Sequence, residues 1–167
     1  MRDIEKIHKV FVGIGSNIEP ILHINQCLTA LKNCFNLIKL SPVYETSSMG
    51  FSGPNFYNLA AYFETTLDVI SLKTKLNEIE KLNGRHADEV KFSSRTLDID
   101  ILYYDDLIDD SKNIPRSEII KFDFVLRPLY DLEPGFIHPI TKKTHNTMLS
   151  DTRYQKMIIK HINFRFK

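Results

Sequence analysis

The chain has 167 residues, and its 22 Lys plus Arg against 21 Asp plus Glu leave a net charge of +1. This length suffices for one domain with a hydrophobic core, whereas a general nucleic-acid binder would be more basic. No apolar run approaches the roughly 18 residues of a transmembrane helix, and the N-terminus lacks a signal peptide's apolar core. We therefore expect a soluble cytoplasmic protein that binds neither nucleic acid nor a membrane.

The first third of the chain predicts a strand, a helix and a second strand. Residues 8–14 read as a strand that runs into Gly15-Ser16-Asn17, where Asn17 could cap the helix. The apolar stripe of that helix would be Ile21, Ile24, Leu28 and Leu31. Residues 36–44 look like a second strand, in which Pro42 indicates a bulge or an edge position.

The middle of the chain predicts a loop, a strand, a helix and another strand. Residues 46–55 are dense in Ser, Gly and Pro and should form a loop, and residues 56–65 a strand. A helix is expected over residues 68–83, ended by Gly84. Its apolar residues at steps of three and four are Val69, Leu72, Leu76 and Ile79.

After a polar loop over residues 85–94, another strand completes the order β-α-β-β-α-β. This order is typical of a ferredoxin-like α+β sandwich, with both helices on one sheet face and the other face free for a site. A short helix is expected over residues 124–134. We expect a single domain over residues 1–167, with its core at about 8–140 and a C-terminal extension at 141–167.

The cysteines and histidines argue against a disulfide and against zinc. Cys27 and Cys34 are seven residues apart on a predicted helix, about 10.5 Å along its axis, which is too far for a disulfide. The six histidines lack paired metal-ligand spacing.

The stretch RTLDIDILYY, from Arg95, places two carboxylates on one face of a strand. Side chains alternate along a strand, so Asp98 and Asp100 share the face opposite Leu97, Ile99 and Ile101, about 7 Å apart. Like charges repel unless a cation lies between them, and oxygen ligands at this spacing suit Mg²⁺. The alternative is an ordinary solvated strand face.

Three further positions could carry chemistry. Asn58 shares a strand face with Phe56 and Tyr62, and its amide could bond a heterocycle beside stacking rings or simply bond backbone. Glu80 and Arg85 could point into a nucleotide site or pair at the surface. Arg95 could likewise point into a nucleotide site, or it could be only the counter-ion of the two aspartates.

The turn Gly15-Ser16-Asn17 could bind an anion at a helix N-terminus, although such turns are common. A nucleotidyltransferase is disfavoured, because its Gly-Ser pair usually lies within about a dozen residues of the two aspartates, and some eighty intervene here.

Four segments together resemble the 6-hydroxymethyl-7,8-dihydropterin pyrophosphokinase family of folate biosynthesis. They are IGSN at 14–17, YETSSMGFSGPNFYNLA at 44–60, Glu80-x4-Arg85 followed by RTLDIDI at 95–101, and FVLRPL at 124–129. They occur in the family's order over roughly residues 10–140. The resemblance implies a ferredoxin-like α+β fold and transfer of the β,γ-pyrophosphate of ATP to the pterin hydroxymethyl group, which releases AMP.

The resemblance also assigns residues. Asp98 and Asp100 would hold two Mg²⁺ ions, and with Arg85 and Arg95 would form the catalytic group. The pterin would be bound by Thr46, Ser47, Ser48, Phe56, Asn58 and Phe124. The co-substrate ATP would be bound by Glu80, Arg85, Lys91, Arg95, Ile101 and Arg116.

Several positions depart from the family pattern, mostly among the cationic residues that would bind ATP. Ala87 and Phe122 replace arginines, Lys91 replaces an arginine, and Arg116 replaces a histidine. Because lysine cannot reproduce the bidentate fork of arginine, we expect slower catalysis or weaker ATP binding than in a typical member.

Two alternatives remain open from the sequence. One is a paralogue that binds pterin but has lost most ATP-dependent transfer, and the other is an RNA-binding ferredoxin-like domain, which the acidic pair disfavours. The extension could pack on the core or dock a neighbouring folate-pathway enzyme.

Overall fold

The computed structural model describes residues 4–85, 90–151 and 153–167, and over this range the chain forms one six-stranded antiparallel sheet. The order across the sheet is β5-β1-β4-β3-β6, and β2 also pairs with β4. The strands are β1 (His8–Ser16), β2 (Asn36–Leu40), β3 (Val43–Thr46), β4 (Phe56–Thr65), β5 (Asp98–Tyr104) and β6 (Ile158–Ile162).

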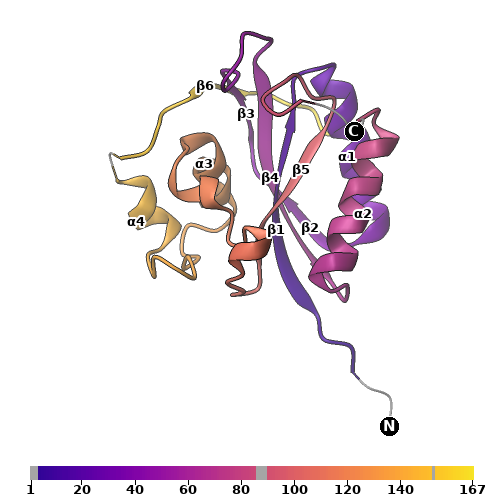
Figure 1. The fold of residues 1–167 in the computed structure, drawn as a ribbon, viewed down its shortest axis with the longest axis vertical. Helices are drawn as coiled ribbons and strands as arrows, with labels where there is room; N and C mark the ends of the chain where they lie inside the picture. The colour runs from indigo at the N-terminus through magenta and orange to yellow at the C-terminus, as the bar shows by residue number, and fades with distance from the viewer. Residues whose placement is uncertain (1–3, 86–89, 152) are drawn as a thin grey trace.

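Helices lie on both faces of the sheet (Figure 1). The helices α1 (Pro20–Cys34) and α2 (Val69–Leu82) cover one face, whereas α3 (Asp123–Leu132) and α4 (His145–Leu149) lie over the other. Two short 3₁₀ turns, Asp110–Lys112 and Ser117–Ile120, precede α3. The expected mixed class with an antiparallel sheet is confirmed. The two helices of the predicted unit, α1 and α2, lie on one face as expected. The expectation that the other face is free is wrong in part, because the apolar side of α3 packs on it.

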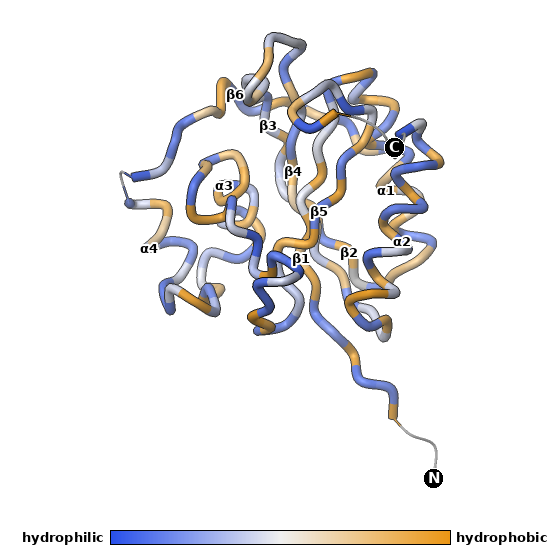
Figure 2. Tube along the Cα trace, viewed as in Figure 1, coloured by the Kyte–Doolittle hydropathy of each residue, from blue (hydrophilic) through white to orange (hydrophobic). Residues whose placement is uncertain are grey.

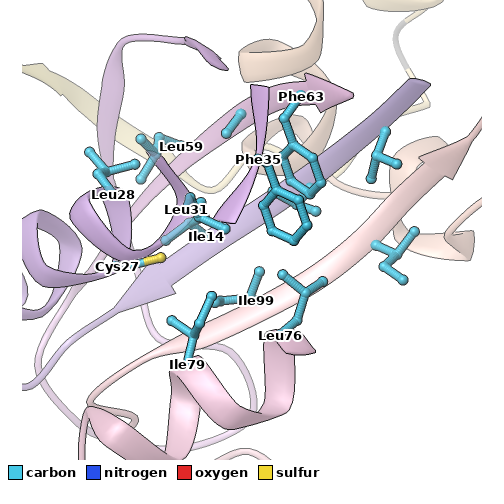
Figure 3. Packing of buried hydrophobic residues seen from close by; sticks show 14 of the residues in the cluster. Ile14, Cys27, Leu28, Leu31, Phe35, Leu59, Phe63, Leu76, Ile79 and Ile99 are labelled. Atoms are coloured by element: carbon cyan, nitrogen blue, oxygen red, sulfur yellow. The ribbon is translucent and has the colours of Figure 1, made fainter. Parts of the chain in front are cut away.

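The main core lies between the sheet and the first two helices (Figure 3). Alternate strand residues point into it, and each of these buried aliphatic side chains stabilises the fold by about 1.5–3 kcal/mol. Hydrophobic and hydrophilic residues alternate along α1 and α2, as one-sided burial requires (Figure 2). The labelled residues of this core are Ile14, Cys27, Leu28, Leu31, Phe35, Leu59, Phe63, Leu76, Ile79 and Ile99.

The start of α1 differs from the sequence expectation. The helix begins at Pro20 after Glu19, which has left-handed backbone (φ 43°) and makes no side-chain cap bond, so Asn17 is not the cap. Ile21 is 57% exposed, and Cys27 completes the buried stripe in its place.

The other predicted boundaries agree more closely with the structure. Residues 36–44 lie in two strands that are interrupted at Ser41 and Pro42, so the irregularity predicted at Pro42 is confirmed. Ser41 Oγ accepts a hydrogen bond from Ala60 N at 2.8 Å at this break. Asp68 caps α2 by accepting a bond from Ser71 N, and Gly84 has the expected positive φ, 83°.

The C-terminal extension packs on the rest of the chain. It supplies the edge strand β6, and Lys167 N then donates to Asn25 Oδ1 of α1 at 2.8 Å. Cys27 and Cys34 are free thiols, as expected. Within the residues that the structure describes, no helix combines the length and apolar character needed to cross a membrane.

A second, smaller core beneath α3 and α4 contains two buried histidines. The rings of Phe136 and His145 stack beside Tyr103, whose hydroxyl lies 3.0 Å from His145 Nε2. Burial lowers the pKa of His145 and lowers that of His138 to about 4. Both histidines are therefore neutral in the folded protein at pH 7.

Because these histidines are buried, the stability of the folded chain depends on pH in the acidic range. The pKa of His138 is lower in the folded than in the unfolded chain, so protonation of this residue favours unfolding. The free energy of unfolding is therefore unaffected by the titration of His138 above about pH 6.5, and it falls by up to about 3 kcal/mol as the pH approaches 4. We expect His138→Asn, whose Oδ1 can replace Nδ1 as the acceptor of Ile140 N and Thr141 N, to flatten this loss in thermal unfolding between pH 7 and 4. An unchanged pH profile would contradict this, and exposed His161→Asn is the control.

Candidate functional site

A cavity of about 320 Å³ lies on the second sheet face, between the ends of the central strands and α3. It is bordered by the loop over residues 47–55 and the segment that leads into β5. Its lining contains Gly13, Ile14, Gly15, Thr46, Ser47, Met49, Phe51, Phe56, Asn58, Leu59, Ala60, Arg85, Lys91, Phe92, Ser93, Arg95, Asp98, Asp100, Leu102, Arg116, Glu118, Phe124 and Val125.

The floor of this cavity is set by strand register. Gly15 of β1 pairs with Asn58 of β4 on one side and Asp98 of β5 on the other. Gly13 likewise separates Ala60 from Asp100. Paired residues share a face, and neighbouring strands are about 4.8 Å apart, so the amide and the carboxylate stand about 10 Å apart over a glycine. A Cβ at Gly15 would lie 2.7 Å from Asn58 Oδ1, and any larger residue would close this gap.

At one end of the cavity, Arg85 connects two carboxylates. Its Nη1 lies 2.5 Å from Asp98 Oδ1 and 3.1 Å from Glu80 Oε1. Glu80 is buried and also accepts a hydrogen bond from Ile99 N at 2.8 Å, which holds α2 to β5. Burial raises the pKa of Glu80, against the opposing effects of that bond and of Arg85. Glu80 therefore lies behind the cavity and acts on it through Arg85.

Asp100 lies in the most unfavourable electrostatic position of the cavity. Burial, and secondly the charge of Asp98, raise its pKa to about 7, although Arg116 lies 3.4 Å away and lowers it. Arg116 N donates to Leu102 O at 3.0 Å, and its Nε lies 3.1 Å from Glu118 Oε2. Sequence reasoning missed Glu118, because it lies two residues after Arg116 in a segment for which no element was predicted and which has no periodic signal.

The opposite end of the cavity is an amide and aromatic pocket. Asn58 Nδ2 donates to Thr46 Oγ1 at 2.8 Å, and Thr46 is 1% exposed. Phe56 of β4 and Phe124 of α3 line this end, as does Ser47. Ser48 does not line the cavity; its hydroxyl donates to Phe51 O at 2.8 Å within the loop. Tyr62, expected beside Asn58, instead contacts Phe11 in the second core, with ring centroids 5.1 Å apart.

Asn17 joins the loops that border the cavity. Its Oδ1 accepts from Arg95 N at 2.7 Å, and its Nδ2 donates to Pro54 O at 3.1 Å. The amides of Asn17 and Ile18 both donate to Arg95 O. These two amides are therefore already bonded to a carbonyl and do not offer the anion site that the turn could have formed. Arg95 reaches Ser93 Oγ with its Nη1 at 2.7 Å.

The remaining predicted positions are spread around the site. Lys91 is exposed at the cavity rim, with its Nζ 5.1 Å from the centre of the Phe92 ring. The side chain of Ile101 lies in the main core, away from the cavity. Phe122 stacks on Phe124 at 5.4 Å, and Ala87 lies outside the described residues.

The model of the family described as 7,8-dihydro-6-hydroxymethylpterin-pyrophosphokinase (HPPK) matches residues 11–134. The 2-amino-4-hydroxy-6-hydroxymethyldihydropteridine pyrophosphokinase of Aquifex aeolicus is 36% identical, over 80% of this chain and 86% of that protein. The Pseudomonas aeruginosa protein of the same name is 34% identical, over 80% and 85%.

Some similar proteins are much longer than this chain. Folic acid synthesis protein FOL1 of Dictyostelium discoideum is 35% identical over 83% of this chain, which spans 22% of that protein. A crystal structure of Plasmodium falciparum HPPK-DHPS superposes with a TM-score of 0.69 at 14% identity, over 88% of this chain and 44% of that one. At this identity the likeness concerns the fold alone.

The raised pKa of Asp100 predicts a stability cost at neutral pH. Because this carboxyl binds its proton more tightly in the folded than in the unfolded chain, stability falls as the pH rises from about 4 through about 7. Asp100→Asn should therefore raise the free energy of unfolding at pH 8 by about 2 kcal/mol, and change it little at pH 4. Denaturant titrations at both pH values test this against exposed Asp110→Asn; equal effects at the two pH values would refute it.

Proposed function

The chain belongs to the 7,8-dihydro-6-hydroxymethylpterin-pyrophosphokinase family, and from this membership we infer its reaction. It transfers a pyrophosphoryl group from ATP to the hydroxymethyl group of 6-hydroxymethyl-7,8-dihydropterin, with release of AMP, in folate biosynthesis. The chain is thus an ATP-dependent diphosphotransferase. Nothing in the comparisons favours the alternative of a pterin-binding paralogue without transfer activity.

We propose that the cavity over Gly13 and Gly15 is the site of this reaction. The observation that carries the proposal is the row Asn58–Gly15–Asp98, which sets an amide pocket and an acidic pair about 10 Å apart in one cavity. One end can recognise a planar heterocycle, and the other can meet phosphates. A substrate bound at both ends would have its reacting groups brought together between them.

The acidic pair fits Mg²⁺ better than a metal that needs a complete protein cage. Among the described residues no group of three or more His, Cys, Asp or Glu side chains could hold a metal. Mg²⁺ is commonly bound by only one or two carboxylates and otherwise by water and substrate phosphates. We propose that Asp98 and Asp100 hold two Mg²⁺ ions, which when bound would neutralise the phosphate charge of ATP.

The protein's own groups would orient the two substrates. Asn58 and Thr46, with Ser47 and the backbone around Ser48, would bond the pterin edge, while Phe56 and Phe124 enclose its ring. The cations would bind ATP oxygens and stabilise the charge of the in-line transfer, and Glu80 would position Arg85. These cations are Arg85, Lys91, Arg95 and Arg116. Since the side chain of Ile101 is in the core, only its backbone could contact ATP.

We also propose a ferredoxin-like unit, weakened ATP binding and a partner enzyme. The β1-α1-β2-β4-α2-β5 part would be the ferredoxin-like unit, with β3 and β6 as additions. The replacement of arginines at Lys91 and Phe122 would weaken ATP binding relative to a typical member. A neighbouring folate-pathway enzyme is a proposed partner, in keeping with the similarity to the longer HPPK-DHPS chains.

The first test is AMP release from ATP and Mg²⁺, with and without the pterin. We expect AMP only when both the pterin and Mg²⁺ are present. Asp98→Ala should lower turnover by roughly 10³-fold, because transition-state charge loses its stabilisation, and should leave the pterin dissociation constant within a few-fold. Pterin binding without AMP release from the unaltered chain would favour the binding paralogue, and the absence of both would reject the function.

A second test addresses the amide pocket. Asn58→Leu should weaken pterin binding by roughly 10- to 100-fold, because the polar edge of the ligand would be buried without a partner. ATP binding, about 10 Å away, should change little. Calorimetric titration of each substrate measures both effects. Asn55→Leu, in the exposed loop, is the control, and equal pterin affinity in the two variants would contradict the assignment.

A further inference from the structure

After α4 the chain contacts the segment that leads into α3. Gln155 N donates to Lys121 O at 2.9 Å, and Gln155 O accepts from Asp123 N at 3.2 Å. These bonds form a short parallel bridge between Phe122 and Gln155. The next residue after Asp123 is Phe124, which lines the cavity.

Asp123 adds a side-chain connection to the same segment. Its Oδ1 accepts from Met157 N at 2.8 Å, and its Oδ2 lies 3.3 Å from Ile158 N. Hydrogen bonds from amides to a carboxylate are stronger than those between neutral groups. Asp123 is also the first residue of α3, where the helix dipole favours a negative charge. Asp123 therefore links α3 to Met157 and Ile158 through its side chain.

The same residues contact the opposite wall. Met157 O accepts from Ser47 N at 3.3 Å, and Ile158 pairs with Thr46 where β6 joins the edge of β3 (Figure 1). Ile159 is not paired with a residue of β3, because the register between β3 and β6 shifts at this point. Met157 is buried, so the contact is anchored by packing as well as by hydrogen bonds. Thr46 in turn holds the amide of Asn58.

Within four residues, 155–158, the chain thus ties the Phe124 wall of the amide pocket to the Thr46 wall. We infer that this segment, here called the C-terminal clamp, pre-organises the pterin pocket and that Asp123 is its positioning residue. The inference rests on the proposed function. The clamp lies outside residues 11–134 that the family model matches, so membership of the family does not itself imply it. Holding two walls in place before binding lowers the cost of ordering them around a ligand.

The test uses the full chain with Asp123→Ala, and measures KM for the pterin and for ATP from AMP release. We expect the pterin KM to rise roughly tenfold and the ATP KM to stay within about twofold, because only one end of the cavity loses its support. Asp123→Asn, which keeps one acceptor, should restore most of the pterin KM. If the alanine variant does not fold, the KM values of Asp123→Asn are compared with those of the unaltered chain instead. Asp151→Ala, whose carboxylate pairs with exposed Arg153 in the same extension, is the control and should change neither KM.

Amide hydrogen exchange separates the clamp from a general loss of stability. In Asp123→Ala, exchange should accelerate at Ser47, Met157 and Ile158 and stay unchanged in the main core. Equal rises of both KM values, or an unchanged pterin KM despite faster exchange, would overturn the inference and leave the proposed function standing. No pterin binding and no AMP from the unaltered chain would instead overturn the proposed function, and the inference with it.

Discussion

The pairing of β1 with β4 on one side and β5 on the other determines where Asn58, Asp98 and Asp100 lie on the floor of the cavity. Because the register places Gly15 between Asn58 and Asp98, an amide and a carboxylate face the same space with no side chain between them. A shift of one residue in either pairing would point the side chain of Asn58 or Asp98 towards the main core instead. The main core prevents such a shift, since Leu59 and Ile99 would then lose their burial.

The acidic end of the cavity is unfavourable for the folded chain by itself. Asp98 and Asp100 are close together and partly buried, and Arg85 and Arg116 offset only part of this cost, as the raised pKa of Asp100 indicates. Such an arrangement lowers stability but leaves strong binding capacity for cations and phosphates. It is what the proposed site for Mg²⁺ and ATP requires. The amide end carries no such like-charge repulsion, and Asn58 Nδ2 donates to Thr46 Oγ1 there.

Sequence reasoning worked best where one local pattern dominated. The alternation of RTLDIDI was enough to place Asp98 and Asp100 on the face opposite Leu97, Ile99 and Ile101, and Gly84 was enough to mark the end of α2. It failed where distant contacts decide. Asn17 read as a helix cap, but its amide bonds two loops far along the chain. Tyr62 shared a strand face with Asn58, yet the aromatic second core holds it well away from the cavity.

The main elements, the acidic pair and the family could be predicted from the sequence, because periodicity, turn residues and motif order are properties of short stretches. Three further features become visible in the folded chain alone: α3 covers the second face, Glu80 pairs with Arg85, and Glu118 pairs with Arg116. The contacts of residues 155–158 with the walls of the amide pocket are visible there as well. These contacts join residues far apart in the chain or within an irregular segment, where no periodic signal exists, so they arise only once the sheet has brought the segments together.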